Sequence, residues 1–122
     1  MSKVKIIECP RDAMQGIKSH FIPSEAKARY INSLLKVGFD TIDFGSFVSP
    51  KAIPQMRDTA KVLSQLDLSE TKSKLLAIVA NIRGANDASV FEEIDYLGYP
   101  FSISENFQMR NTSKTIEESI VT

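Results

Sequence analysis

The sequence predicts an α/β fold, namely the N-terminal half, or about four βα units, of a (β/α)8 TIM barrel. Short apolar runs that suit strands alternate with segments of helical spacing roughly every 35 residues, which favours a mainly parallel sheet. A whole barrel of this kind needs about 250 residues. The 122 residues therefore predict a single domain, residues 1–122, that stops at the start of its fourth helix.

The strands are predicted from apolar runs. The third is the clearest, because Leu-Leu-Ala-Ile-Val-Ala is the continuous run expected of a parallel strand covered on both faces. The fourth is the weakest, since Gly98 and Pro100 interrupt it and proline cannot donate to a strand ladder. The expected strands span residues 4–8, 39–44, 75–80 and 96–104.

The helices are predicted from caps and periodicity. Ser24 is the expected N-cap of the first helix, and Gly38 is its stop in the left-handed conformation. A second helix is expected around residues 56–63, and a weaker third over residues 85–93. The connections expected to be loops are residues 11–23 and 45–54.

A helix start lies close to the C-terminal end of the sequence. Thr115 and Glu118 have the capping-box spacing Thr-x-x-Glu. Thr122 is the last residue, and so short a helix is not stable alone in water. We therefore expect the sequence to be cut inside its fourth helix.

Composition excludes several classes of protein. Hydrophobic residues make up 43% and charged residues 25%, as in soluble globular proteins. The 15 basic and 15 acidic residues cancel, so neither nucleic acid nor a membrane is expected as a partner. The one cysteine, Cys9, excludes an internal disulfide, and we expect no secretory signal because the first residues lack a long apolar run. We expect a cytoplasmic protein in which Cys9 is a buried, inert thiol.

The barrel prediction also selects candidate functional residues, because active sites of such barrels lie at the C-terminal ends of the strands. Asp12 follows the first strand and could bind a hard cation such as Mg²⁺ or Mn²⁺, while Arg11 could stabilise an oxyanion beside it. An isolated Arg-Asp pair is more often a surface ion pair or a loop cap. The polar residues of the three selected loops are Arg11, Asp12 and Gln15, then Asp43, Ser46, Ser49 and Lys51, then Asn81 and Arg83.

The same loops carry motifs in a defined order. Residues 10–15 read Pro-Arg-Asp-Ala-Met-Gln, residues 46–56 read Ser-Phe-Val-Ser-Pro-Lys-Ala-Ile-Pro-Gln-Met, and residues 81–84 read Asn-Ile-Arg-Gly. They resemble the P-R-D-G-L-Q, S-F-V-S-P-K-x-x-P-Q-M and N-x-[KR]-G of the hydroxymethylglutaryl-CoA lyase family. Residues 104–119 resemble the family's segment leading into the fourth helix, so the resemblance covers essentially the whole chain.

The resemblance implies a reaction and a role for each matching residue. The reaction is retro-aldol-type cleavage of hydroxymethylglutaryl-CoA, or a related 3-hydroxyacyl-CoA, to an acyl-CoA and a carbonyl product, with Mg²⁺ or Mn²⁺ as Lewis acid. An acyl-CoA substrate and a homodimer of the full-length protein are expected. The roles that the resemblance implies are metal binding for Asp12, catalysis for Arg11, Gln15 and Asp43, and substrate binding for Lys18, Ser46 and Asn81.

The sequence departs from the family pattern in ways that limit the prediction. Ala13 stands where the family has glycine, and Asp43 stands where it has a glutamate, which is longer by roughly 1.5 Å. The family's H-x-H metal ligands, metal-binding asparagine and catalytic cysteine belong to its second half, so we expect this chain alone to be inactive. Two alternatives stay open: an inactive half-barrel or partner-binding fragment, and a synthase of the same superfamily that condenses its substrate with acetyl-CoA.

Overall fold

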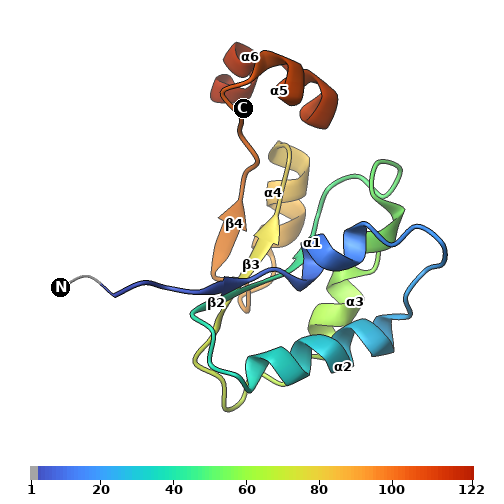
Figure 1. Cartoon of the computed structure of the whole chain (residues 1–122), viewed down its shortest axis with the longest axis vertical. Helices are drawn as coiled ribbons and strands as arrows, with labels where there is room; N and C mark the ends of the chain where they lie inside the picture. The colour runs from blue at the N-terminus through green and yellow to red at the C-terminus, as the bar shows by residue number, and fades with distance from the viewer. Residues whose placement is uncertain (1–2) are drawn as a thin grey trace.

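Four strands form one sheet in the structure, a computed structural model that describes residues 3–122 (Figure 1). Helices follow each strand, as the βα repeat predicts. The elements in chain order are β1 (Ile7–Glu8), α1 (Pro10–Gln15), α2 (Ser24–Leu35), β2 (Thr41–Ser46), the 3-10 helix η1 (Pro54–Met56), α3 (Thr59–Ser64), β3 (Lys74–Ile78), α4 (Ile82–Ser89), β4 (Tyr96–Gly98), α5 (Glu105–Thr112) and α6 (Ile116–Val121).

The sheet is parallel throughout. Its strand order, β1-β2-β3-β4, follows the chain, and the C-terminal ends of the strands therefore meet at one edge. Asp43 pairs with Leu76 in the register of β2 and β3, and an irregularity follows between Asp43 and Gly45. Such irregularities bend a strand and redirect its side chains, and they are common beside active sites. The predicted α/β class is confirmed.

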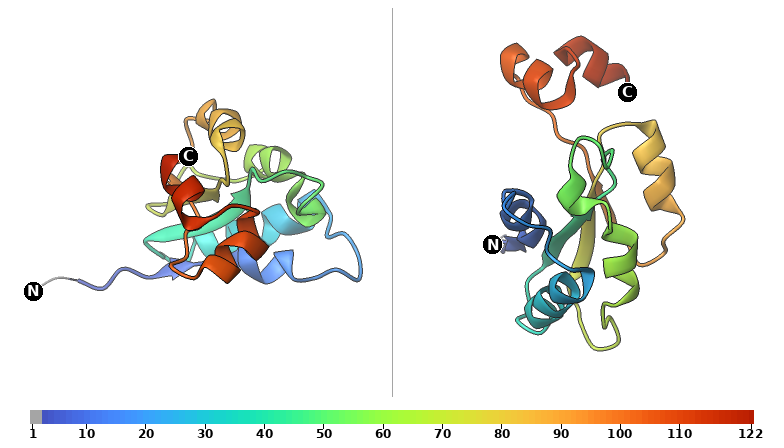
Figure 2. Two further views of the ribbon diagram at one scale, coloured as in Figure 1. Left: turned by 90° about the horizontal axis from the view of Figure 1, so that it is seen from above. Right: turned by 90° about the vertical axis from the view of Figure 1, so that its right-hand side faces the viewer.

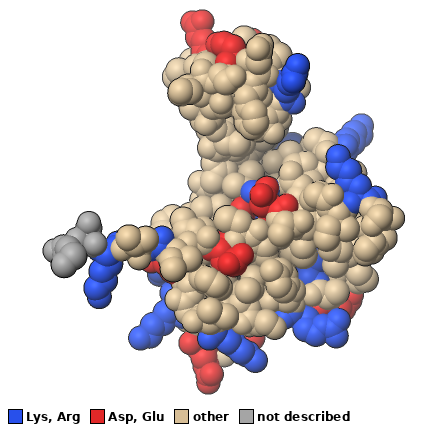
Figure 3. Space-filling model, in the orientation of Figure 1, with Lys and Arg blue, Asp and Glu red and all other residues tan. Residues whose placement is uncertain are grey.

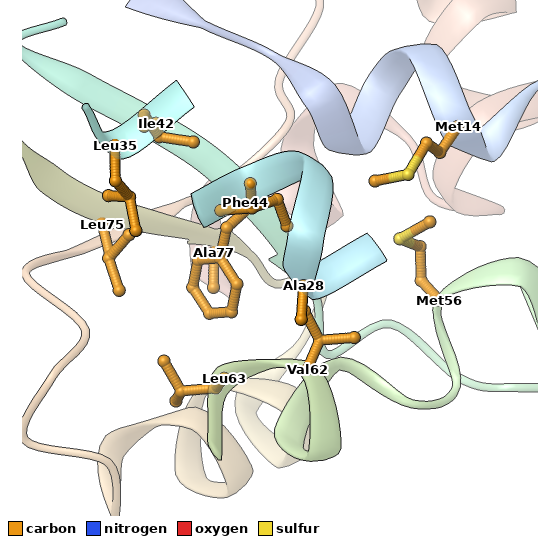
Figure 4. Close-up of a cluster of buried hydrophobic side chains, with 11 residues drawn as sticks. Met14, Ala28, Leu35, Ile42, Phe44, Met56, Val62, Leu63, Leu75 and Ala77 are labelled. Atoms are coloured by element: carbon orange, nitrogen blue, oxygen red, sulfur yellow. The ribbon is translucent and has the colours of Figure 1, made fainter. Parts of the chain in front are cut away.

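The hydrophobic core lies between the sheet and helices α2 and α3. Figure 4 shows Ile42 and Phe44 of β2 and Leu75 and Ala77 of β3 in a cluster with side chains of these two helices. Successive residues of a strand point to opposite faces. Asp43, between Ile42 and Phe44, therefore points to the face of the sheet away from α2 and α3.

The prediction that the third strand is covered on both faces is wrong for the part of the chain that the structure describes. Leu75 and Ala77 are buried, whereas Leu76 and Ile78 between and beyond them are only partly buried. The apolar run is continuous because both faces are apolar. In residues 3–122, however, α2 and α3 cover one of them, and the side chains of Leu76 and Ile78 lean over Gly98 of β4 on the other.

Two local predictions near the N-terminus are wrong. Residues 11–23 do not form one loop, because α1 begins at Pro10, whose fixed φ suits the first position of a helix. Ser24 is the first residue of α2 and not its cap. Its hydroxyl donates to Asp58 at 2.6 Å. Helix α2 ends at Leu35, ahead of Gly38, which does take the predicted left-handed conformation with φ 98°.

The elements after β3 differ from their predicted bounds. Helix α4 begins at Ile82, earlier than predicted, because the Asn81 side chain caps it. Strand β4 ends at Gly98, so residues 99–104 leave the sheet. Helix α5 was not predicted, because its sequence has almost no apolar face. The predicted capping box of α6 is confirmed, since Thr115 and Glu118 bond each other's backbone N–H groups.

Helices α5 and α6 form a lobe that stands away from the rest of the fold (Figures 1 and 2). Gln108 is fully buried inside it, and its side-chain Nε2 donates to Ser119 Oγ at 2.8 Å while its side-chain Oε1 accepts from the Ser102 N–H at 2.8 Å. The Tyr99 hydroxyl donates to the Ser119 carbonyl at 3.0 Å. These bonds tie the lobe to the extended segment after β4.

The surface carries charges of both signs. On the face shown in Figure 3, acidic and basic side chains are interspersed over the body of the molecule. Within residues 3–122, none of the helices combines the length and the hydropathy that crossing a bilayer requires.

Candidate active site

A buried ion pair joins the first helix to the second strand. Arg11 lies in the first turn of α1, and Asp43 lies within β2. Arg11 Nη2 donates to Asp43 Oδ2 at 2.8 Å, and Arg11 Nε donates to the two carboxylate oxygens at 3.1 Å and 3.0 Å. Arg11 Nη1 donates to Gln15 Oε1 at 2.7 Å, one helical turn along α1. The structure thus brings together the three residues that the sequence predicts to be catalytic.

The pair is shielded from solvent. The side chains of Arg11 and Asp43 are 14% and 6% exposed. Burial raises the pKa of the Asp43 carboxyl above its usual value, the hydrogen bonds and charge of Arg11 oppose that rise, and the charge of Asp12 adds to it. A buried carboxylate without its partner is strongly destabilising. The ionised form of Asp43 therefore depends on Arg11.

Arg11 keeps donors for a ligand. A guanidinium has five N–H groups in a planar fork. Its contacts with Asp43 and Gln15 use the Nε proton and one proton on each Nη. The second proton on each Nη makes no hydrogen bond within residues 3–122, and the bonds to the Asp43 carboxylate fix the orientation of the guanidinium plane.

Asp12 points outward instead of joining this group. Its side chain is 74% exposed, and its Oδ1 lies 3.7 Å from Arg11 Nη1, which is too far for a hydrogen bond. Arg11 therefore hydrogen-bonds Asp43, whereas its contact with Asp12 is a longer ion pair on the exposed side. Within residues 3–122, no three acidic, histidine or cysteine side chains are grouped to hold a metal ion. Asp12 suits Mg²⁺ or Mn²⁺ as a single oxygen ligand, and such a cation needs about six.

Two of the predicted substrate-binding residues already have local hydrogen bonds. Ser46 is buried at the end of β2, and its Oγ accepts from the Val48 N–H at 3.1 Å. Asn81 Oδ1 accepts from the Gly84 N–H at 2.8 Å as the cap of α4. No hydrogen bond within residues 3–122 links either side chain to the Arg11–Asp43 pair. A substrate contact by Asn81 would use its Nδ2.

Lys18 borders a groove between the loop after α1 and the turn that contains η1. The groove has a volume of about 400 Å³, and Lys18, His20, Phe21, Gln55 and Arg57 are among the residues that line it. We call it the Lys18 groove. Its charged side chains are basic, and the Arg57 guanidinium stacks on the Phe21 ring, 3.8 Å from its centroid. Such a groove suits an anionic ligand that also has flat or apolar parts.

Relatives of the chain are found among curated sequences. No protein-family model matches the chain. The mitochondrial hydroxymethylglutaryl-CoA lyase of Gallus gallus is 35% identical over 121 residues, which are 97% of this chain. A cytoplasmic 3-hydroxy-3-methylglutaryl-CoA lyase of Rattus norvegicus is 34% identical over 120 residues, which are 96% of this chain.

The solved structures that resemble the chain are also lyases of this kind. The HMG-CoA lyase of Bacillus subtilis matches 98% of the chain with a TM-score of 0.88 and 34% identity. An HMG-CoA lyase of Acinetobacter baumannii, solved with coenzyme A and 3-methylmalate, matches 96% with a TM-score of 0.87 and 31% identity. The chain belongs to the hydroxymethylglutaryl-CoA lyase family. It spans between 34% and 39% of the length of these four relatives.

Membership of the lyase family explains the open sheet. The structure is part of the TIM barrel of these lyases, as the sequence predicts, and its sheet superposes on theirs over nearly the whole chain. The face of β2 and β3 that carries Asp43 is the face that a closed barrel turns inward. The Arg11–Asp43 pair accordingly lies on the inner face, with Arg11 just past the C-terminal end of β1 and Asp43 within β2, near the end of the barrel where active sites of this fold are built.

Sequence reasoning missed two features of this lyase-family chain. Cys9 is exposed and not buried, because β1 is short and Cys9 follows it; partial burial of its thiol still raises the pKa. Lys27 was not singled out, yet it is buried and paired with Asp58. A signal for Lys27 was present, since it stands at helical spacing with the buried Ser24 and Ile31 on the inner side of α2.

Proposed function

We propose that the whole protein is a carbon–carbon lyase that cleaves hydroxymethylglutaryl-CoA, or a related 3-hydroxyacyl-CoA, to an acyl-CoA and a carbonyl product. The observation that carries this proposal is the buried Arg11–Asp43 pair, with Gln15 on the same guanidinium, in a chain of the hydroxymethylglutaryl-CoA lyase family. A guanidinium held by a carboxylate at the inner edge of the strands suits a reaction that develops negative charge on a thioester oxygen.

The chemistry is a retro-aldol-type cleavage. A base removes the proton of the 3-hydroxyl, the carbon–carbon bond breaks, and its electron pair forms a thioester enolate that is then protonated. The two remaining N–H groups of Arg11 bind the thioester oxygen as its negative charge grows. Asp43 and Gln15 hold the guanidinium in place, so their contribution is to its direction and charge.

Asp12 is the proposed ligand from this chain for Mg²⁺ or Mn²⁺. The bound metal would supply Lewis-acid stabilisation of the developing charge. The outward carboxylate of Asp12 supports this role, because its oxygens are exposed beside the Arg11 guanidinium. Replacing Asp12 with Asn should raise the Mn²⁺ concentration needed for half-maximal activity. An unchanged Mn²⁺ dependence would contradict the assignment.

The acyl-CoA is proposed to approach through the Lys18 groove. The relative from Acinetobacter baumannii was solved with coenzyme A, and the basic lining of the groove suits the phosphates of that ligand. Ser46 and Asn81 are proposed substrate contacts at the ends of β2 and β3.

We also propose that the whole protein is a homodimer and that it is cytoplasmic. The exposed, unpaired Cys9 supports the cytoplasmic location, because such thiols are typical of reducing compartments.

Product analysis on the whole protein tests the proposal. With hydroxymethylglutaryl-CoA and Mn²⁺, the expected products are acetyl-CoA and acetoacetate, and a panel of 3-hydroxyacyl-CoAs identifies the best acyl group. Release of free coenzyme A from acetyl-CoA plus a 2-oxo acid would instead identify a synthase. Absence of both reactions in protein that binds Mn²⁺ would contradict both activities and favour a partner-binding role.

A further inference from the structure

A second buried ion pair lies behind the Lys18 groove. The Lys27 side chain is 3% exposed, and its Nζ donates to Asp58 Oδ1 at 2.6 Å and to the carbonyl oxygen of Gln55. The same Nζ lies over the Phe21 ring, 4.3 Å from its centroid. Two of the three N–H groups of the ammonium bond Gln55 and Asp58, and the charge also faces the aromatic ring. Because the side chain is almost fully buried among these partners, Lys27 does not present its charge to a ligand.

The partners of Lys27 come from three separate segments of the chain. Phe21 lies in the loop before α2, Gln55 lies in η1, and Asp58 lies at the start of α3. Two of them, Phe21 and Gln55, line the Lys18 groove, and Arg57 of the groove stacks on Phe21. One buried side chain thus contacts residues on both walls of the groove.

Asp58 bonds the side chains of α2 instead of capping its own helix. It occupies the N-cap position of α3, where an aspartate normally accepts from the N–H groups of its own helix. Its side chain makes no such cap bond. Its oxygens accept instead from Lys27 Nζ and from Ser24 Oγ, each at 2.6 Å. Helix α3 therefore lacks a side-chain cap, and the Asp58 carboxylate binds Lys27 instead.

Simple attachment of α2 to α3 does not require this arrangement. The same helices are also joined at the surface by Lys61 and Glu25, 3.6 Å apart and well exposed. Replacing both members of a buried ion pair by apolar residues is often neutral for stability or even favourable. The contact that such a replacement cannot reproduce is the bond from Lys27 to the Gln55 carbonyl.

We propose that Lys27 is a positioning residue of the Lys18 groove, which holds the turn containing Gln55 and Arg57 against Phe21 in the geometry that binds the coenzyme A part of the substrate. This inference rests on the proposed acyl-CoA function. It assigns to α2, which contributes no group to the site, control over the affinity for the substrate.

The experiment compares three variants of the whole protein. Lys27→Met removes the ammonium, Lys27→Met with Asp58→Leu removes the pair and leaves no buried charge, and Lys61→Met is the matched control because it breaks the exposed ion pair between the same helices. Each is measured for coenzyme A affinity by calorimetry, for steady-state kinetics, for melting temperature and for hydrogen exchange of the amides of residues 52–57.

Lys27→Met should weaken coenzyme A binding and raise KM by about tenfold or more, with kcat within about threefold, because Lys27 does not contact Arg11, Asp43 or Gln15. Exchange of residues 52–57 should be faster. In the double variant the melting temperature should recover while the affinity stays low. Lys61→Met should leave all four measurements unchanged.

Two outcomes would overturn the proposal: unchanged affinity and exchange in Lys27→Met, or recovery of affinity together with melting temperature in the double variant, since either makes the pair purely structural. If Lys27→Met does not fold, the double variant alone decides. A wild-type protein that binds no coenzyme A would contradict the proposed function, and faster exchange of residues 52–57 in Lys27→Met would then still show that Lys27 holds the turn.

Discussion

At the scale of single residues, the Arg11–Asp43 pair separates what a motif predicts from what only a fold provides. The sequence predicts Arg11, Asp12 and Gln15 as neighbours at the end of a strand, and Asp43 at the end of the next. It does not predict that Arg11 turns from Asp12 to Asp43, because those two side chains are 32 positions apart and meet only once α1 lies across β2. The roles of all four residues stay predictions.

Replacing Arg11 with Met tests its catalytic role. The change keeps the aliphatic bulk and removes a charge that is matched to an oxyanion formed only in the transition state. We expect kcat of the whole protein on its best substrate to fall by about 100-fold, or about 2.7 kcal/mol, with a much smaller change in KM. A kcat within about threefold of wild type would make Arg11 a structural partner of Asp43.

The same variant should change how stability depends on pH. Burial raises the pKa of Asp43 in the folded state, and Arg11 opposes that rise, so loss of Arg11 moves the folded-state pKa further above its unfolded value of about 3.9. Such a carboxyl stabilises the fold below its unfolded pKa, and this contribution is lost as pH rises through the folded pKa. The free energy of unfolding of Arg11→Met should therefore fall, relative to wild type, as pH rises from about 4 toward neutrality.

Urea unfolding across that pH range measures the effect. The variant Arg11→Met with Asp43→Asn carries no ionisable group at either position and serves as the control. Its stability difference from wild type should vary much less with pH than that of Arg11→Met. An equal pH dependence in the two variants would show that another group causes it.

At the scale of elements, the sequence predicts the number and order of the strands and the place of α2, but it predicts β1 and β4 too long and misses the short helices α1 and α5. The apolar runs predict β2 and β3 because the buried faces of these strands require apolar side chains. Gly38 predicts where the chain turns after α2. The sequence does not predict α1, because only Pro10 and Met14 of its residues are buried. It does not predict α5, because that helix buries Gln108 instead of an apolar side chain. Helices that satisfy polar groups leave little periodicity to detect.

The packing of β2 on α3 depends on Gly45. A Cβ atom added there would overlap Thr59 Cγ2 and would lie 2.9 Å from Thr59 Oγ1, which also accepts from the Ser46 N–H. Gly45→Ala should therefore destabilise the fold by about 1–3 kcal/mol. Adding Thr59→Ser removes the overlapping methyl group, keeps the hydroxyl and should recover part of the loss.

Chemical denaturation measures this pair of variants. Gly16→Ala is the matched control, since the nearest atom to a Cβ added at Gly16 is 3.9 Å away and its φ of −75° suits any residue. A stable Gly45→Ala protein, or no rescue by Thr59→Ser, would show that α3 moves aside readily.

At the scale of the whole molecule, the chain is part of a barrel whose sheet has two open edges, at β1 and at β4. Strands β1 and β4 each pair on one side only, so their outer backbone groups are available to another strand. Leu97, Phe101, Ile103 and Phe107 add exposed apolar surface near β4 and α5. The order of the motifs predicts from the sequence that the barrel is only partly present. It does not predict which side chains lie along the open edges of the sheet.

The isolated 122-residue chain should therefore self-associate. We expect dimers or larger species by size-exclusion chromatography with light scattering, because open strand edges and apolar surface template association. Ile103→Lys with Phe107→Lys should reduce the association, since both side chains are exposed and make no contribution to the core. A monodisperse monomer that melts cooperatively would contradict this expectation.

The extended segment that carries α5 and α6 away from the sheet gives this chain an unusual response to limited proteolysis. No lysine or arginine lies between Arg83 and Arg110, so trypsin has no site in the segment. Phe101 is 47% exposed there, whereas Tyr99 is followed by proline. Chymotrypsin, whose pocket accepts aromatic side chains, should cut first after Phe101 and release the α5–α6 lobe as a fragment, leaving the sheet with its ion pairs whole.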